Sequence, residues 1–312
     1  MRPIDWLRLI VLAAIWGASF IFTRELAPEL GVFGTAATRA LVAGVIMLAY
    51  FQATGFKPEW RKHWRLYAVI AAVNSAIPLS LYSFAALHIP ASYSAIFNAT
   101  SSLFGAVFAA LWIDERFTTR KAAGLAVGIA GVGLVAGAGG ADTNTLFVLS
   151  VLACLGAATC YGIASVYARK HGQGVSPFAI AGCHQVIAGI ALIPLIPVGS
   201  PSPDVTVSLV LNMLALGGLC SAAAHPIYFR LIKDVGPSRA LTVTFLIPAF
   251  AMLWGSIFLG ESITATMLVG TLGIVAGTLL VAGWSRTTVP APPDPAGAAA
   301  ATVAGEPQRT PT

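Results

Sequence analysis

Three ionisable side chains lie well inside apolar runs of this sequence: Arg39, His184 and His225. A charged group is costly to keep away from water, so each is a candidate for charge or proton relay. For Arg39 the alternative is a structural guanidinium bonded to helix-end carbonyls, and for each histidine a satisfied interior hydrogen bond. All twelve acidic residues lie in loops, at helix ends or in the tail, which argues against a metal centre or an acidic proton carrier.

A second set combines hydrogen-bonding and aromatic side chains in the same runs, and such groups suit a cavity for a small solute. Its members are Trp16, Asn74, Tyr82, Asn98, Ser101, Tyr161, His225, Tyr228, Thr244 and Trp254. Pro78, Pro226 and Pro248 interrupt three of the runs, and interrupted helices free backbone groups for binding. The alternative is that the polar groups join helices and the aromatic groups anchor at the membrane surface.

Ser19 gives an alternative from another class, because Gly17-Ala-Ser19-Phe20 fits a short nucleophile turn. With His184 or His225 as the base, the chain would be an intramembrane hydrolase. The motif is short and lies within a long helical run, so we predict that the protein is not an enzyme. No cofactor or metal is predicted, because the four cysteines fall in apolar runs without Cys-x-x-Cys spacing.

The elements that must position these residues are membrane helices. The chain is 57% hydrophobic and only 10% charged, with a mean hydropathy of +0.82, whereas a soluble domain carries about 25% charged residues. Backbone groups in lipid must be bonded within their own segment, so each long apolar run predicts a helix. The fold is therefore predicted as an all-α integral membrane protein with ten transmembrane helices, at 5–23, 31–52, 66–86, 91–113, 119–139, 146–167, 177–198, 206–229, 238–259 and 264–284.

The basic residues test that count independently. With ten spans, 16 of the 18 lysines and arginines fall on one side, Arg24 on the other and Arg39 within a span. The positive-inside rule then predicts a multi-pass protein of the cytoplasmic membrane with both termini in the cytoplasm. The net charge of +6 thus reports orientation, and no nucleic-acid partner is predicted.

The chain also repeats itself. Residues about 145 positions apart match, so that Arg24, Tyr82, Phe104 and Glu115 correspond to Arg169, Tyr228, Phe250 and Glu261, and Arg39 aligns with His184. A repeat of five spans is odd in number, so the second copy enters the membrane from the opposite side. We expect a first repeat at 1–140, a second, inverted repeat at 141–284 and a disordered cytoplasmic tail at 285–312.

Several of these residues carry a resemblance to a known family. The stretch from Ala14 to Phe20, Arg39, and the paired endings Phe104 to Glu115 to Gly137 and Phe250 to Glu261 to Gly283 resemble the two EamA-type domains of the drug/metabolite transporter superfamily. The resemblance covers residues 8–284. It implies a ten-helix fold of two inverted repeats, a central cavity and export of small metabolites such as amino acids. The chain departs from the family where Ser102 replaces a frequent proline, while Pro248 is kept.

We therefore predict a transporter that exports small metabolites, amino acids or related compounds, by alternating access, with a small-molecule substrate and the lipid bilayer as partners. A channel or sensor would instead need a persistent pore or a signalling domain. Glycines four residues apart predict close helix packing, either of two helices with each other or with a second subunit in a homodimer. These are Gly124 with Gly128, Gly133 with Gly137, and Gly273 with Gly277.

Overall fold

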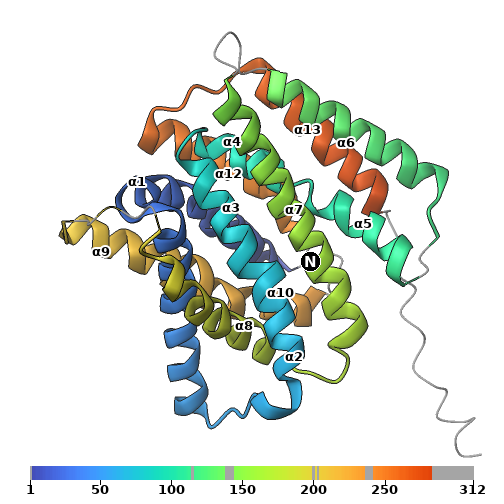
Figure 1. The fold of residues 1–312 in the computed structure, drawn as a ribbon. Coiled ribbons are helices and arrows are strands. Elements are labelled where there is room, and N and C mark those ends of the chain that lie inside the picture. The colour runs from blue at the N-terminus through green and yellow to red at the C-terminus, as the bar shows by residue number, and fades with distance from the viewer. Residues whose placement is uncertain are drawn as a thin grey trace, which may run out of the picture. The chain divides into compact units, whose positions relative to one another are not determined.

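The computed structural model describes residues 2–113, 116–137, 144–198, 201, 204–235 and 242–282. Its regular elements are all helical, and no strand occurs in these ranges (Figure 1). Glu115 and the tail at 285–312, on which predictions were made, lie outside them. The elements are α1 (Pro3–Thr54), α2 (Trp60–Ala71), η1 (Ala72–Ala76), α3 (Ile77–Ala86), α4 (Ala91–Asn98), α5 (Ser101–Trp112), α6 (Thr119–Gly137), α7 (Thr145–His171), α8 (Pro177–Leu192), η3 (Ile193–Leu195), α9 (Val207–Leu214), η4 (Ala215–Ala223), α10 (Ala224–Val235), α12 (Val243–Leu259) and α13 (Ala265–Ala282).

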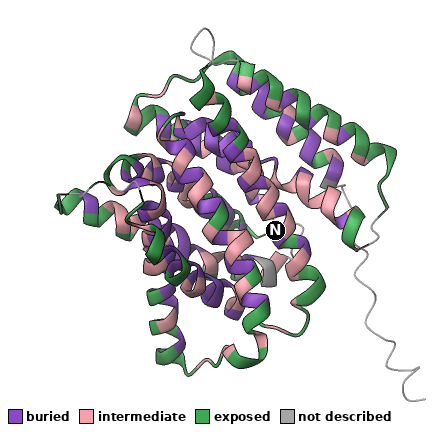
Figure 2. Ribbon diagram, in the orientation of Figure 1, coloured by how far each residue is buried: buried purple, intermediate pink, exposed green. Residues whose placement is uncertain are grey.

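Helices of this chain are long and apolar enough to cross a membrane. Seven such helices occur in the described residues: Pro3–Thr54, Trp60–Ala86, Ala91–Trp112, Thr119–Gly137, Thr145–His171, Pro177–Leu195 and Val207–Tyr228. Two shorter apolar helices follow, Val243–Leu259 and Ala265–Val281. Large apolar side chains such as Leu111, Phe258 and Leu272 are about two-thirds exposed, and Figure 2 shows exposed residues along the outer faces of α6 and α13. Such surfaces suit lipid rather than water, so this is a multi-pass membrane protein.

The first helix differs from the sequence expectation, which placed the end of the first span near residue 23. Helix α1 is continuous for 52 residues except at Gly31, where φ is 69° and ψ is −179°. This left-handed φ is open to glycine and strained for other residues. A helix of that length measures about 78 Å, more than twice the thickness of a hydrocarbon core. Gly31 therefore divides α1 into two arms, 3–30 and 32–54.

Two spans depart from α-helical geometry at corresponding places. The span Trp60–Ala86 contains the π-helix η1, and Val207–Tyr228 contains the π-helix η4. Each π-helix ends within three residues of a proline, Pro78 or Pro226, that was expected to interrupt its span. Such π-helical turns are frequent at functional sites because they shift side chains out of the regular helical pattern.

The fourth span is interrupted although its proline is replaced. Helix α4 ends at Asn98 and α5 begins at Ser101, so the break precedes Ser102. The Ser102 hydroxyl donates to the carbonyl oxygen of Ala99 at 3.0 Å and also bonds to the hydroxyl of Thr278 at 3.3 Å. The hydroxyl thus bonds at the break where the family often has a proline.

Helices α6 and α13 form a close pair and run side by side in Figure 1. A Cβ atom placed on Gly124 would lie 2.6 Å from the carbonyl oxygen of Gly277, and one on Gly131 would lie 2.7 Å from that of Gly270. Only glycine permits this approach. These glycines therefore join the two helices of one chain to each other, whereas a Cβ on Gly133 or Gly137 would meet nothing.

Helices α1 and α8 make two close contacts that are equivalent under the sequence repeat. A Cβ on Gly44 in α1 would lie 3.0 Å from the Cα of Val186 in α8, and one on Gly189 in α8 would lie 3.0 Å from the nitrogen of Leu41 in α1. By the sequence repeat, Gly44 corresponds to Gly189 and Leu41 to Val186. The pair is therefore reciprocal.

A second reciprocal pair joins the first arm of α1 and helix α7 to two other helices. A Cβ on Gly17 would lie 2.8 Å from the Cβ of Phe250 in α12, and one on Gly162 in α7 would lie 2.9 Å from the Cβ of Phe104 in α5. Gly17 corresponds to Gly162 in the repeat, as Phe104 does to Phe250. Exchanging the two halves therefore converts one contact into the other.

Candidate functional site

Three predicted cavity residues meet where α3, α4 and α7 approach one another. The hydroxyl of Tyr82 in α3 donates to Oδ1 of Asn98, the last residue of α4, at 3.0 Å. The ring of Tyr82 stacks on Tyr161 of α7, with centroids 6.1 Å apart, and Phe20 of α1 meets it edge-on at 5.6 Å. Sequence reasoning missed Phe20 because an aromatic residue within an apolar run carries no distinguishing signal. We call Phe20, Tyr82, Asn98 and Tyr161 the tyrosine cluster.

The two predicted tryptophans lie on α1 and on the helix that packs against it. The ring of Trp16 lies 5.3 Å from that of Tyr228 in α10. The indole nitrogen of Trp254 in α12 donates to the carbonyl oxygen of Ala14 at 3.0 Å. Ser101 begins α5, and Thr244 lies in the first turn of α12.

Arg39 lies on the second arm of α1, opposite η4. Its Nε donates to the hydroxyl of Ser221, a residue only 1% exposed, at 3.2 Å. It also interacts electrostatically with Tyr82, Tyr161 and His225. Its hydrogen-bond partner is thus a side-chain hydroxyl rather than a helix-end carbonyl. Arg39 is therefore near enough to the tyrosine cluster and to His225 to interact with both, and His225 donates from Nδ1 to the carbonyl oxygen of Ser221.

His184 lies at the repeat-equivalent position on α8, opposite η1. It is 2% exposed, and its Nδ1 lies 2.6 Å from the carbonyl oxygen of Ile180 while Asn74 lies 3.2 Å from its Nε2. A neutral imidazole with its hydrogen on Nδ1 satisfies both bonds, with Nε2 accepting from the Asn74 amide. Beside it, the hydroxyl of Ser75 donates to Oε1 of Gln185 at 3.2 Å. These bonds favour the structural alternative for His184.

Ser19 has the surroundings of a structural hydroxyl. It is 4% exposed and donates to the carbonyl oxygen of Trp16 at 2.7 Å, the local bond that serines often make within helices. Among the described residues, this carbonyl is the partner of its hydroxyl, and neither candidate histidine bonds to it. A nucleophile needs a base within hydrogen-bond reach, so the geometry gives the hydrolase alternative no support.

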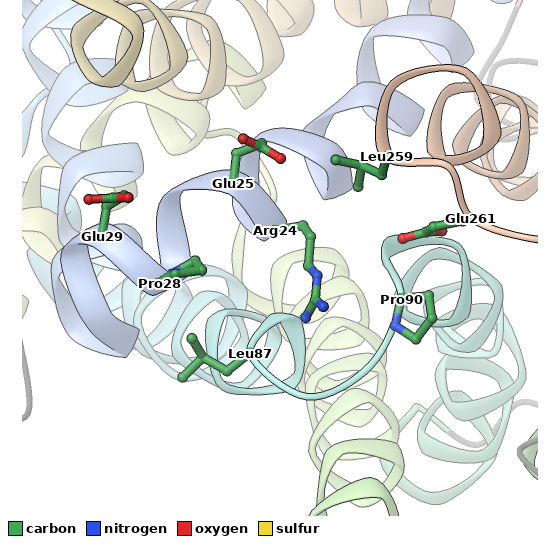
Figure 3. A pocket seen from close by; sticks show the side chains of 8 residues that line it. All are labelled: Arg24, Glu25, Pro28, Glu29, Leu87, Pro90, Leu259 and Glu261. Atoms are coloured by element: carbon green, nitrogen blue, oxygen red, sulfur yellow. The ribbon is translucent and has the colours of Figure 1, made fainter. Parts of the chain in front are cut away.

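A charged pocket that the sequence did not predict opens where the first arm of α1 ends. It measures about 420 Å³ and is lined by Arg24, Glu25, Pro28, Glu29, Leu87, Pro90, Leu259 and Glu261. Figure 3 shows Arg24 reaching across it toward the segment that carries Leu87 and Pro90; Arg24 donates to the carbonyl oxygen of Ala86. None of the ten predicted cavity residues lines this pocket. The sequence feature that could have indicated this pocket is the pair Glu25 and Glu29, which lie one helical turn apart.

Glu261 closes one side of this pocket by capping α4. Its carboxylate accepts from the backbone nitrogens of Ala91 at 2.6 Å and Ser92 at 3.0 Å, and from the Ser92 hydroxyl. A carboxylate at a helix N-terminus satisfies otherwise unbonded N–H groups and the helix dipole. The repeat signature that carried the resemblance thus has a structural function at this position.

An ion-pair network joins the start of α1 to the end of α10. Asp234 bonds to Arg8 at 2.7 Å, Arg2 at 3.1 Å and Arg230 at 3.2 Å, and Asp5 pairs with Arg2 at 3.1 Å. Partial burial of Asp234 acts to raise its pKa, but hydrogen bonds from Arg230 and Arg8 outweigh it and lower that pKa below the usual value. Among all the described residues, no group of three His, Cys, Asp or Glu side chains could hold a metal ion.

Apolar membrane helices, π-helical interruptions and interior groups that bond across helices place this chain in the class of multi-pass membrane proteins. The model of the EamA-like transporter family matches the chain twice, over residues 6–137 and 148–283. The chain belongs to this family, and its members are transporters.

Individual relatives agree with that assignment. The chain is 27% identical to the uncharacterized transporter YvbV of Bacillus subtilis, over 88% of this chain and 90% of that protein. It is 25% identical to a probable terminal-alkyne amino-acid exporter of Streptantibioticus cattleyicolor, over 88% and 91% of the two chains. A solved crystal structure at 19% identity matches with a TM-score of 0.62 over 90% of this chain and 96% of that one, and so shares its fold.

Proposed function

We propose that this transporter exports a small metabolite, an amino acid or a related compound, by alternating access between two inverted five-helix halves. The halves are residues 1–140 and 141–284, followed by a cytoplasmic tail at 285–312. The reciprocal contacts carry the proposal. Gly44 of the first half contacts Val186 of the second, and the repeat-equivalent residues Gly189 and Leu41 make the corresponding contact with the halves exchanged. Two halves related in this way can exchange conformations, which closes one entrance as the other opens.

The helix count supports ten spans. Gly31 divides the first of the seven long apolar helices into two arms, each longer than the roughly 20 residues that one crossing needs. With the two shorter apolar helices, Val243–Leu259 and Ala265–Val281, ten crossings result. Each half then contains five of them.

Contacts between helix ends support the alternation of sides. Asp234, after the eighth predicted span, bonds to Arg2 and Arg8 at the start of the first. Glu261, after the ninth, bonds to Ala91 at the start of the fourth. Both pairings join ends that the ten-span scheme assigns to one side. The excess of basic residues on the side of Arg2 favours the cytoplasm there, with both termini on that side.

The substrate class rests on two observations. A relative of similar length is named as a probable amino-acid exporter. The interior of this chain offers aromatic rings, amides and hydroxyls with few charged groups, which suits a small solute with a polar head better than a polyanion. A homodimer stays a prediction, since the closely packed glycines lie between helices of the same chain.

Transport is tested with purified protein in liposomes loaded with a labelled panel of amino acids, amines, sugars and carboxylic acids. We expect efflux of at least one amino acid or close relative, saturable and absent from empty liposomes. Failure to move any member of the panel, with or without a proton or sodium gradient, would overturn the proposed function.

Topology is tested by single cysteines in a background that lacks the four native ones. Ser262→Cys follows Glu261 and should react with a membrane-impermeant maleimide in intact cells, whereas Lys57→Cys should react only after lysis. Equal labelling of the two variants in intact cells would overturn the inverted arrangement. A cysteine near the Pro90 turn, Leu87→Cys, is the matched control and should behave as Ser262→Cys does.

A further inference from the structure

Arg39 is a cation in the interior of the bundle whose charge no described side chain compensates. Its hydrogen bond to Ser221 uses one of the five N–H donors of the guanidinium. Among the described carboxylates, Asp234 bonds to arginines at the helix ends and Glu261 bonds to the start of α4. None of them forms an ion pair with Arg39.

The position of Arg39 makes the lack of an ion pair with a described carboxylate significant. It is the eighth residue of the second arm of α1, about 12 Å from Gly31, and thus far from both surfaces of a hydrocarbon core. A guanidinium remains charged at any physiological pH. A charge inside a membrane is costly without a counter-charge, so an anion that arrives during the transport cycle would stabilise Arg39.

The surroundings limit what that anion can be. Tyr82 and Tyr161 interact electrostatically with Arg39 and stack on each other, and Tyr82 bonds to Asn98. A carboxylate matches the planar fork of a guanidinium and can accept two parallel hydrogen bonds from it. The tyrosine cluster offers ring faces and an amide to the rest of a small solute. An anion with two or more charges would bring more negative charge than this single cation balances.

We propose that Arg39 is the substrate-binding residue that recognises a carboxylate group of the transported solute, with the tyrosine cluster contacting the remainder. This inference rests on the proposed function, because it assigns the polar head of the solute to one residue. A single carboxylate is matched by the single cation Arg39. The repeat-equivalent position therefore needs no second cation, in keeping with the neutral, fully bonded His184 found there.

The test compares matched pairs of labelled probes that differ only in the carboxyl group. Phenylalanine, leucine and alanine are each paired with their amides, and transport is measured in liposomes containing the wild-type protein. We expect the acids to be carried and the amides to have KM values about 10- to 100-fold higher, as for loss of a hydrogen-bonded charge pair. If acids and amides are carried equally well, the inference is overturned while the proposed function stands. If no probe of either kind moves, the wider panel decides: transport of solutes without a carboxyl group alone overturns the inference, and failure of the whole panel overturns the proposed function as well.

Variants locate the preference at Arg39. Arg39→Gln should raise KM for the acids about 10- to 100-fold and leave KM for the amides unchanged, and Arg39→Lys should fall between the two because it keeps the charge without the fork. His184→Gln is the matched control at the repeat-equivalent position and should keep the wild-type preference for acids. An Arg39→Gln protein that retains this preference would contradict the inference. Should that variant not fold, Arg39→Lys tests the same residue, and a wild-type KM for the acids in Arg39→Lys would contradict the inference.

Discussion

Arg39 and His184 occupy repeat-equivalent places but differ in the hydrogen bonds that their surroundings provide. In each, a residue on one half faces a π-helix of the other half, η4 for Arg39 and η1 for His184. His184 is 2% exposed and bonded through both ring nitrogens. Arg39 is bonded to one hydroxyl. The repeat thus places two ionisable residues at equivalent positions, and the two differ in how many of their hydrogen-bonding groups have partners among the described residues.

The largest effect should come from breaking the structural side of this comparison. His184→Ala removes a buried ring and leaves Asn74 without its partner, so we expect the free energy of unfolding to fall by about 2–4 kcal/mol. Arg39→Gln removes an interior charge that no described side chain pairs with, so it should change the free energy of unfolding by less than about 1 kcal/mol, or raise it. Unfolding of both variants in detergent measures the difference. Similar losses in the two variants would make Arg39 a structural residue too.

A smaller effect should separate the two serines of the π-helices. Ser75→Ala leaves Oε1 of buried Gln185 without its hydrogen bond and should cost about 1 kcal/mol of stability. Ser221→Ala removes the hydrogen bond that orients Arg39, so we expect little loss of stability but about a threefold rise in KM for transported carboxylates. Stability and transport of both variants are measured side by side. The reverse pattern would contradict the roles assigned to the two sites.

The smallest effect should lie outside both sites, in the ion-pair network between α1 and α10. The pKa of Asp234 is lower in the folded protein than in the unfolded chain, so this carboxylate contributes stability at neutral pH and loses it as pH falls through its folded-state pKa. Melting temperatures measured from pH 7 down to pH 3 should therefore fall more for the wild type than for Asp234→Asn. Parallel curves would show that the network contributes nothing measurable.

Much of the architecture was predictable from the sequence because each membrane helix is marked by its own run of apolar residues. Backbone groups in lipid must bond within their own segment, so apolar runs mark the helices. The predicted run at 119–139 accordingly corresponds to α6 at Thr119–Gly137. The boundary within α1 was misplaced because Glu25 and Glu29 look like a loop, whereas the helix continues to Gly31, whose left-handed φ provides the turn.

Individual contacts within the site were less predictable, because they depend on how distant helices pack. The sequence identified Tyr82, Asn98 and Tyr161 as members of a set, but not that Tyr82 bonds to one and stacks on the other. Arg39 and His184 looked alike as interior ionisable residues. Their partners, Ser221 and Asn74, come from spans far away in the chain.

By itself, then, the sequence determined that this chain crosses the membrane many times, repeats itself and belongs among carriers, since hydropathy, basic residues and repeated motifs are properties of the linear chain. Only the tertiary structure decided which interior groups are satisfied and which retain unused hydrogen-bonding capacity. The physical reason is that a hydrogen bond or an ion pair depends on atoms from different helices coming within a few ångströms, and no local pattern encodes that distance.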